Sequence, residues 1–243
     1  MQELKLSLVT GKVGRDESFA RLVDSIFTHT RTPWELVVAD ASPEPYVSSL
    51  PNVRVLHEKP RLTHSKGYNA AFRACLGEFI LWLNDDAEVC EGYDTAAVAF
   101  MESHPTIGLG VLHYSENGEP FRWNSAWTCG YGNFGIFRKT LGEKVGYFDD
   151  EISMYGADNS LAIRILMADY GIADIPAARI LHHSVKDEIR SENQANRRRD
   201  NKILTDKYMP HRNHWQKVYR KHEHHCTAVP WAHGVNPQLA GVR

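Results

Sequence analysis

The sequence of 243 residues predicts an α/β protein with a parallel sheet flanked by helices. Two observations carry this prediction. Short apolar runs alternate along the chain with longer segments whose apolar residues recur at helical spacing. Acidic residues directly follow several of the apolar runs, at the strand ends where open sheets of this kind bind ligands. With 42% hydrophobic and 24% charged residues, the chain suits one large domain or a domain with an appendage.

The first half of the chain supplies most of the predicted sheet. Strands are expected where the apolar runs are short, at residues 4–10, 36–39, 53–56, 79–83 and 107–114. Helices are expected where the apolar residues share one helical face, at 17–28, 65–76 and 93–103. Strands and helices that alternate at this spacing indicate a parallel sheet with helices on its faces.

The second half is less regular. Residues 117–135 are rich in Gly, Asn and Trp, and we expect loops with short strands there. A helix should start near Ala157 and end at Gly171, its C-cap. Short strands should follow at 172–175 and 179–181. The polar segment beyond residue 184 is expected to form an extended or helical arm, at about 193–208.

The stretch ILWLNDDAEV, residues 80–89, carries the strongest functional signal. An apolar strand pattern ends in Asp85 and Asp86, and adjacent carboxylates resist burial unless a cation compensates them. Asp40 ends an earlier strand and can converge on the same cleft. A solvated turn before the next element also explains Asn84-Asp85-Asp86. Delivery of the acids to the ligand-binding edge favours an Mg²⁺ or Mn²⁺ site, with Asp86 as the direct ligand.

Three segments in this order resemble the glycosyltransferases of GT-A fold, specifically the large family 2. They are VVADAS, which contains Asp40, then HSKGYNAAFRACLGEFILWLNDDAEV, and later GNFGIFRKTLGEKVGYFDDEISMYGADNSLAIRI. The resemblance covers roughly residues 4–184 and rests on the order and spacing of the motifs together. It implies a Rossmann-like α/β fold with a mixed, mostly parallel sheet flanked by helices. It also implies a metal-dependent, inverting enzyme that moves a sugar from a nucleotide-diphosphate donor, above all a UDP-sugar, to an acceptor hydroxyl.

The resemblance also implies roles for single residues. Asp40 would read the nucleotide base, and Asp86 would bind Mn²⁺ or Mg²⁺ together with His182 or His183. Asp158 would be the base that activates the acceptor hydroxyl, since the reaction requires that hydroxyl to lose its proton. Read without the resemblance, Asp158 is explained by the preference of acidic residues for the first turn of a helix, and the histidine pair by surface exposure.

The sequence departs from the family pattern at three places. The acidic motif begins with Asn84 where the family has Asp. The family's Glu-Asp pair is Ala157-Asp158 here, and the later acid of that motif is Ser160. Asp158 is therefore the one candidate base that the motif retains.

Further candidates line up with the donor and the acceptor. Donor candidates end the first strand, surround the start of the helix at 65–76 or belong to the acidic motif: Thr10, Gly11, Arg61, Lys66, Gly67, Asn69, Asn84 and Asp85. Acceptor candidates are aromatic residues of the loop-rich stretch, whose faces could stack on a sugar or a base: Trp123, Trp127 and Tyr131. Burial in the core explains such aromatics equally well.

The charge distribution sets the end of the chain apart. Residues 179–225 hold 12 Lys or Arg against 6 Asp or Glu, whereas residues 1–178 hold 15 against 24. We expect a catalytic domain at 1–184, with its nucleotide-sugar half at about 1–90 and its acceptor half at about 91–184, followed by a basic, His-rich C-terminal arm at 185–243. The arm could be solvated, close over the donor diphosphate, or hold an anionic acceptor such as nucleic acid. Its histidines and Cys226 also permit a late zinc site.

Two rival functions stay open at this stage. A nucleotidyltransferase also joins an α/β sheet to an acidic metal site, but it would release pyrophosphate. A nucleic-acid-binding or DNA-modifying protein would use the basic arm, for example to glycosylate a hydroxylated base in DNA. The chain shows no signal-peptide pattern and no apolar run long enough to span a bilayer, so we expect a cytoplasmic protein. The four scattered cysteines predict free thiols.

Overall fold

The fold is described from a computed structural model, which describes residues 3–126, 129–185, 187–227 and 231–232. Within these residues an eight-stranded sheet has the order β3-β2-β1-β4-β9-β6-β10-β5. Its strands are β1 (Leu6–Lys12), β2 (Trp34–Asp40), β3 (Val53–His57), β4 (Phe79–Leu83), β5 (Ala87–Val89), β6 (Ile107–Glu116), β9 (Gly135–Arg138) and β10 (Gly171–His182). A small second sheet joins β7 (Asn124–Ala126), β8 (Cys129–Tyr131) and β11 (Trp231–Ala232).

The large sheet is mixed and mostly parallel. The four strands from β3 to β4 run parallel, as do β6 and β10, whereas β9 is antiparallel to both of its neighbours and β5 is antiparallel to β10. Register pairs Lys12 of β1 with Asp40 of β2, and Thr10 with Leu83 of β4. The carboxyl ends of these three strands therefore meet at one edge, as the acidic strand ends predicted.

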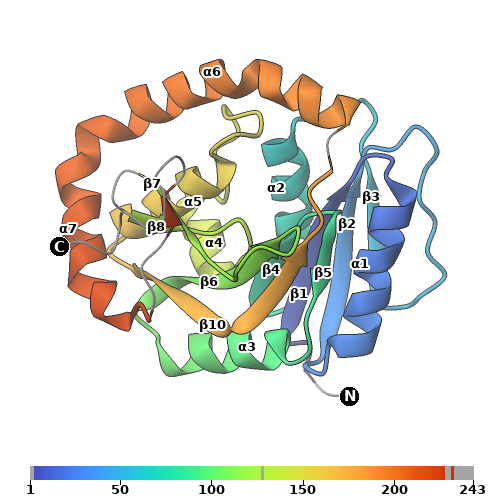
Figure 1. The fold of residues 1–243 in the computed structure, drawn as a ribbon, viewed down its shortest axis with the longest axis horizontal. Helices are drawn as coiled ribbons and strands as arrows, with labels where there is room; N and C mark the ends of the chain where they lie inside the picture. Colours follow the sequence, from blue (N-terminus) through green and yellow to red (C-terminus); the bar gives the residue numbers. More distant parts are fainter. Residues whose placement is uncertain (1–2, 127–128, 186, 228–230, 233–243) are drawn as a thin grey trace.

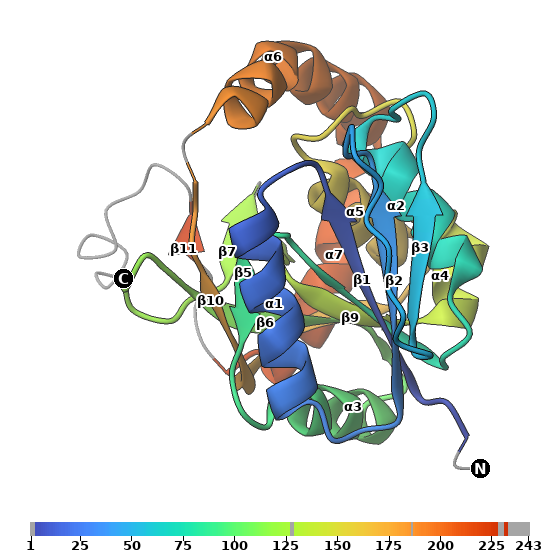
Figure 2. The same ribbon diagram turned by 90° about the vertical axis from the view of Figure 1, so that its right-hand side faces the viewer.

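Helices cover both faces of the sheet. Figure 2 shows α1 (Asp16–His29) and α3 (Tyr93–Ser103) on one side, and α2 (His64–Ala74), α4 (Lys139–Val145) and α5 (Ala157–Met167) on the other. The alternation along β4 explains the two layers: Leu81 and Leu83 pack in the cluster under α1 and α3, whereas Ile80 and Trp82 pack in the cluster under α2 and α5. A strand buried on both faces reads as a continuous apolar run, which is what residues 79–83 are.

Residues 188–225 of the basic arm are mostly helical and pack against the body. Figure 1 shows α6 (Glu188–Tyr208) running along one edge of the molecule from the end of β10 to α7 (Arg212–His222). Short 3₁₀ helices at Met209–His211 and Glu223–His225 flank α7. Leu204 and Tyr208 of α6, with Trp215, Val218 and Tyr219 of α7, belong to the same apolar cluster as α2 and α5. The division of the chain at residues 184 and 185 stays a prediction.

The predicted fold class is confirmed, and two details of the predicted elements are wrong. The helix at Ala157 ends at Met167, so Gly171 is not its C-cap but the first residue of β10. The two short strands expected at 172–175 and 179–181 are one strand, interrupted by a register shift between Ile175 and Arg179. All four cysteines are free thiols, as predicted. Among the described residues no helix is long and apolar enough to cross a membrane.

Candidate active site

A cavity of about 310 Å³ lies beyond the carboxyl ends of β1, β2 and β4. This is the edge at which open parallel sheets bind ligands. Its walls come from the loop after β1, the start of α2, the acidic motif, the end of β10 and the start of α5. The polar and aromatic residues that line it include Lys12, Arg15, Glu58, Arg61, His64, Tyr68, Trp82, Asn84, Asp85, Asp86, Asn133, Tyr155, Asp158 and His182.

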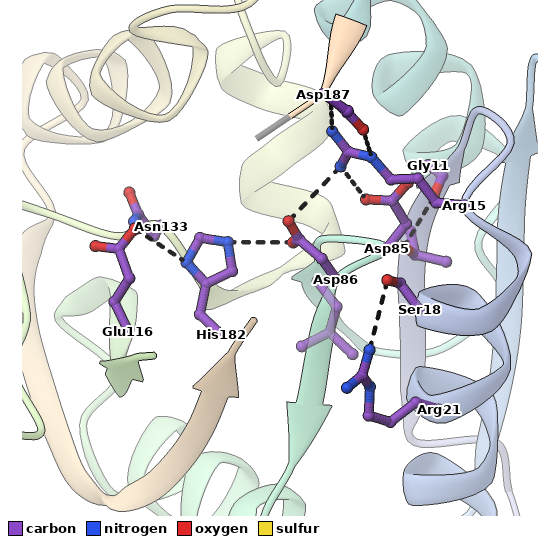
Figure 3. A network of polar contacts seen from close by, with 12 residues as sticks. Gly11, Arg15, Ser18, Arg21, Asp85, Asp86, Glu116, Asn133, His182 and Asp187 are labelled. Carbon is purple, nitrogen blue, oxygen red and sulfur yellow. Dashed lines mark hydrogen bonds and ion pairs between the residues drawn. The ribbon is translucent and has the colours of Figure 1, made fainter. Parts of the chain in front are cut away.

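The acidic pair is compensated by a side chain of the protein. Nη1 of Arg15 lies 3.0 Å from Oδ1 of Asp85 and 3.6 Å from Oδ2 of Asp86 (Figure 3). On the other side, Nε2 of His182 lies 3.1 Å from Oδ1 of Asp86. Pairing of β10 with β5 sets this last contact, because His182 is opposite Ala87, the residue that follows Asp86. Two adjacent carboxylates can be buried here because the guanidinium of Arg15 lies between them and the imidazole of His182 contacts Asp86.

The two carboxyl groups differ in acidity. Burial raises the pKa of Asp85 to about 6, with the charge of Asp86 adding to the effect and Arg15 opposing it. Burial also acts to raise the pKa of Asp86, but the hydrogen bond and charge of His182 and the charge of Arg15 outweigh it, so that the pKa is lowered. Asp86 is therefore the more strongly ionised of the pair at neutral pH.

Asp86 and His182 form a donor set that suits a divalent cation. A carboxylate oxygen and an imidazole nitrogen are both ligands of Mn²⁺. Nδ1 of His182 is buried without a hydrogen-bond partner, its nearest carboxylate oxygen being Oε1 of Glu116 at 4.0 Å. In the described part of the chain no three His, Cys, Asp or Glu side chains are grouped to hold a metal. The residues thus fit a cation that takes two ligands from the protein and the rest from a substrate.

Of the two candidate histidines, the structure brings His182 to Asp86. Nε2 of His183 lies 2.9 Å from Oε2 of Glu88, on the other face of the strand end. His183 therefore points away from the acidic pair, and its expected part in a metal site is not supported. The late zinc site is likewise not supported, since the histidines of residues 211–225 and Cys226 belong to the described residues that form no metal-holding group.

Asp158 reaches the same cavity from the start of α5. Burial raises the pKa of its carboxyl to about 7, although its Oδ1 accepts the N–H of Asn159 at 2.8 Å. Burial and the charge of Asp158 both raise the pKa of Tyr131. A carboxyl group that changes charge near neutral pH is suited to accept a proton from a bound hydroxyl.

The loop before Asp158 is held by the arm. Asp200 of α6 is fully buried, and its carboxylate accepts the backbone N–H groups of Ser153, Met154 and Tyr155 at 2.9–3.1 Å. Gly156 follows with φ 94°, and a Cβ there would lie 1.9 Å from Cδ1 of Leu204. The glycine thus allows both the left-handed turn and the close approach of α6. Through these contacts the arm shapes the segment that presents Asp158.

The predicted donor residues divide into two groups. Gly11, Arg61, Gly67, Asn84 and Asp85 line the cavity, whereas Thr10, Asp40, Lys66 and Asn69 are not among the residues that line it. The carboxylate of Asp40 accepts the N–H groups of Ser42 and Tyr46 at 3.0 and 2.7 Å. The amide of Asn69 donates to the carbonyl of Phe148 and accepts its N–H. Both side chains shape neighbouring loops, and their contact with a donor stays a prediction.

The predicted acceptor aromatics lie mostly in the core. Trp123 is 1% exposed, and its ring lies over Gly130, where a Cβ would be 2.0 Å from Cζ3. Tyr131 is 7% exposed. Neither residue lines the cavity, so burial in the core explains these aromatic residues better than stacking on an acceptor. Trp127 lies outside the described residues.

Several residues of the cavity were missed by the sequence reasoning. Lys12 ends β1, and Arg15 follows it closely. Asp40 was singled out because it ends the next strand, and the same argument could have found these two residues. Trp82 lines the cavity and donates its indole N–H to the carbonyl of Asn133 at 2.9 Å. A buried strand residue of this kind carries no signal of its own in the sequence.

Comparisons with known proteins support this picture. The model of the family described as "Glycosyl transferase family 2" matches residues 14–161, more than half of the chain. The chain is 23% identical over 221 residues to an "O-antigen biosynthesis protein RfbC" of Myxococcus xanthus, and 22% identical over 204 residues to an "Uncharacterized glycosyltransferase YwdF" of Bacillus subtilis (strain 168). Each alignment covers 74% of this chain, which spans 17% of the first protein and 74% of the second.

Solved structures share the fold. The mannosyltransferase PcManGT from Pyrobaculum calidifontis, in complex with GDP-Man and Mn²⁺, has a TM-score of 0.61 at 18% identity, over 79% of this chain and 61% of that one. TarS 1-349 from S. aureus, in complex with UDP-GlcNAc, has a TM-score of 0.59 at 16% identity, over 77% of this chain and 61% of that one. These likenesses confirm the predicted fold class.

Proposed function

The chain belongs to glycosyltransferase family 2, and from that premise we propose that it transfers a sugar from a UDP-sugar to an acceptor hydroxyl, with inversion at the anomeric carbon. That the chain is a glycosyltransferase of the GT-A fold follows from the family and its structural neighbours. The finer proposal rests on one observation. A single cavity brings together the pair Asp86 and His182 and, from the start of α5, the carboxyl group of Asp158.

We propose that the donor diphosphate lies at the end of the cavity formed by the acidic motif. The solved neighbours with GDP-Man and Mn²⁺ and with UDP-GlcNAc support a nucleotide-sugar donor. Lys12, Arg15 and Arg61 also line the cavity and add positive charge to it. Asp86 and His182 would hold Mn²⁺ or Mg²⁺, which would supply charge stabilisation of the leaving diphosphate.

Asp158 would act on the acceptor. Its carboxylate takes the proton of the acceptor hydroxyl as the oxygen forms a bond to the anomeric carbon. The bond between that carbon and the diphosphate oxygen breaks, and the nucleoside diphosphate leaves with its negative charge. A base that approaches from the start of α5, with the leaving group on the acidic motif, supports in-line displacement and hence inversion.

Three cations of the basic arm are engaged by the body of the protein. Nζ of Lys207 pairs with Asp149 and Glu151 of the body at 2.8 Å, and the guanidinium of Arg197 lies over the ring of Tyr155. Nη1 of Arg199 donates to Oγ of Ser153 at 3.2 Å. These cations serve to hold the arm to an acidic body. We propose a glycan hydroxyl as the acceptor class, and glycosylation of DNA stays a prediction.

Product analysis tests the proposal. The full chain is incubated with UDP-glucose, UDP-GlcNAc and GDP-mannose, each with Mn²⁺, and the nucleotide products are separated. We expect release of a nucleoside diphosphate from one UDP-sugar, by transfer or by slow hydrolysis, and a loss of about 10²–10⁴-fold in Asp158→Asn with donor binding retained. Release of pyrophosphate would indicate a nucleotidyltransferase instead. Wild-type rates in Asp158→Asn would remove the assignment of the base.

A further inference from the structure

The guanidinium of Arg15 is surrounded by three carboxylates. Its Nε and Nη2 lie 2.7 and 2.9 Å from the two oxygens of Asp187, a bidentate pair, while Nη1 faces Asp85 and Asp86 (Figure 3). Asp187 stands just before α6, in the connection between β10 and the arm. Arg15 thus joins the loop after β1, the acidic motif and the start of the arm.

The backbone at Arg15 adopts the left-handed conformation, which is unusual for a residue other than glycine. Arg15 has φ 53° and ψ 44°, directly after Gly14 with φ 62°. Long side chains rarely adopt the left-handed region, and such a residue persists where its surroundings determine it strongly. The Arg15 side chain is 16% exposed, and the three carboxylates supply those surroundings. The position of the guanidinium is therefore a defined feature of the cavity.

Both oxygens of Asp86 are already engaged. Oδ1 faces His182, and Oδ2 faces Nη1 of Arg15. A divalent cation that binds Asp86 must share this carboxylate with both contacts, and it must approach a guanidinium that stays charged at any physiological pH. The same carboxylates cannot fully stabilise both the guanidinium of Arg15 and a metal ion.

We propose that Arg15 competes with the divalent cation for Asp86, so that the metal binds well together with a nucleoside diphosphate and weakly alone. This inference rests on the proposed function, which assigns the metal to Asp86 and His182. A diphosphate in the cavity offers the guanidinium new anionic oxygens, and the bidentate pair with Asp187 keeps Arg15 near the site when it leaves Asp86. By linkage, the nucleotide then raises metal affinity by the same factor as the metal raises nucleotide affinity.

Binding of Mn²⁺ to the full chain, followed by electron paramagnetic resonance of the free ion, tests the competition. Titrations are made with and without UDP on wild type, Arg15→Gln and Arg21→Gln. Arg21 is the matched control, because it lies on α1 and contacts Oγ of Ser18 at 3.5 Å rather than the acidic motif. We expect Arg15→Gln to bind Mn²⁺ alone at least tenfold more tightly than wild type and to lose most of the enhancement by UDP. Arg21→Gln should match wild type.

A second variant covers the case in which Arg15→Gln does not fold. Asp187→Asn removes the alternative partner of the Arg15 guanidinium, which should then stay closer to Asp86. Mn²⁺ alone should therefore bind more weakly than in wild type, and UDP should raise the Mn²⁺ affinity by a larger factor than in wild type. In the double variant with Arg15→Gln the effect of Asp187→Asn should largely vanish, since the two residues act through one contact.

The outcomes separate the competition from the metal site itself. If Mn²⁺ binds wild type and Arg15→Gln equally, and Asp86→Ala abolishes that binding, the metal site stands and the competition is overturned. If Mn²⁺ binds none of the variants, with or without UDP, the metal assignment of the proposed function fails and the competition fails with it.

Discussion

At Asp158, burial raises the pKa of the carboxyl to about 7, whereas at Asp86 the neighbouring His182 and Arg15 outweigh burial and lower it. One cavity thus holds a carboxyl that titrates near neutral pH and a carboxylate that stays ionised. Environments that separate the pKa values of two carboxyl groups in this way commonly indicate which of them takes part in proton transfer. This difference in pKa supports the proposed roles, in which Asp158 takes the proton and Asp86 binds the cation.

The titration of Asp158 predicts a pH dependence of turnover. A general base must be ionised, so kcat/KM should fall about tenfold per pH unit below about pH 7 and level off above it. The folded pKa lies above the unfolded value of about 3.9, so the contribution of Asp158 to stability is full at low pH and is lost as the pH rises towards about 7. Asp158→Asn removes this dependence and should gain in melting temperature over wild type across that window.

A pH–rate profile and melting temperatures at pH 5 and pH 8 check this prediction. The gain in melting temperature of Asp158→Asn over wild type should be larger at pH 8 than at pH 5. A profile that stays flat down to pH 5 would show that no group with a pKa near 7 limits the reaction, and Asp158 would lose its role.

Among the elements, α6 has the most specific contact with the site. Asp200 binds three successive backbone N–H groups of the segment before Asp158, and Leu204 packs against Gly156. The arm therefore has a structural part in the site that its basic composition did not suggest. An acidic residue at the end of an arginine run carries no sign of burial, since tertiary contacts alone determine it.

Replacing Asp200 tests whether α6 stabilises the segment before Asp158. Asp200→Ala leaves one buried and two partly buried N–H groups without their acceptor, and we expect a loss of about 2–4 kcal/mol in the free energy of unfolding. Asp206→Ala is the control on the same helix, because Asp206 is exposed and pairs with Lys202. Chemical denaturation measures both variants. Equal stability of the two would mean that the buried carboxylate does not hold the loop.

The elements themselves were largely predictable from the sequence. The helix at Tyr93–Ser103 and the strand at Phe79–Leu83 have the predicted bounds, because apolar periodicity reports directly on burial. The end of the helix that starts at Ala157 was not predictable in the same way. Gly171 suits a C-cap, yet α5 stops four residues earlier and the glycine enters β10.

At the scale of the whole molecule, the sheet explains why distant residues meet. Strand ends of β1 and β4, the partner strand β10 and the helix α5 bring Arg15, Asp86, His182 and Asp158 to one cavity. Three of these were predicted: Asp86 from its place at the end of an apolar strand, and His182 and Asp158 from the resemblance to family 2 glycosyltransferases. Arg15 was missed, although it follows the end of the first strand, the kind of position that singled out Asp40, because a lone basic residue was not weighed as a partner of the acidic pair.

The most direct test of the central claim is the binding of nucleotides to this cavity. Melting temperatures of wild type and Asp86→Ala are measured with UDP, GDP, dTDP and CMP, each with and without Mn²⁺. We predict that UDP with Mn²⁺, at about a hundred times its dissociation constant, raises the melting temperature of wild type by about 5–10 °C, and that Asp86→Ala loses the shift. No shift with any nucleotide, or an equal shift in both proteins, would contradict a metal-dependent nucleotide-sugar site at Asp86.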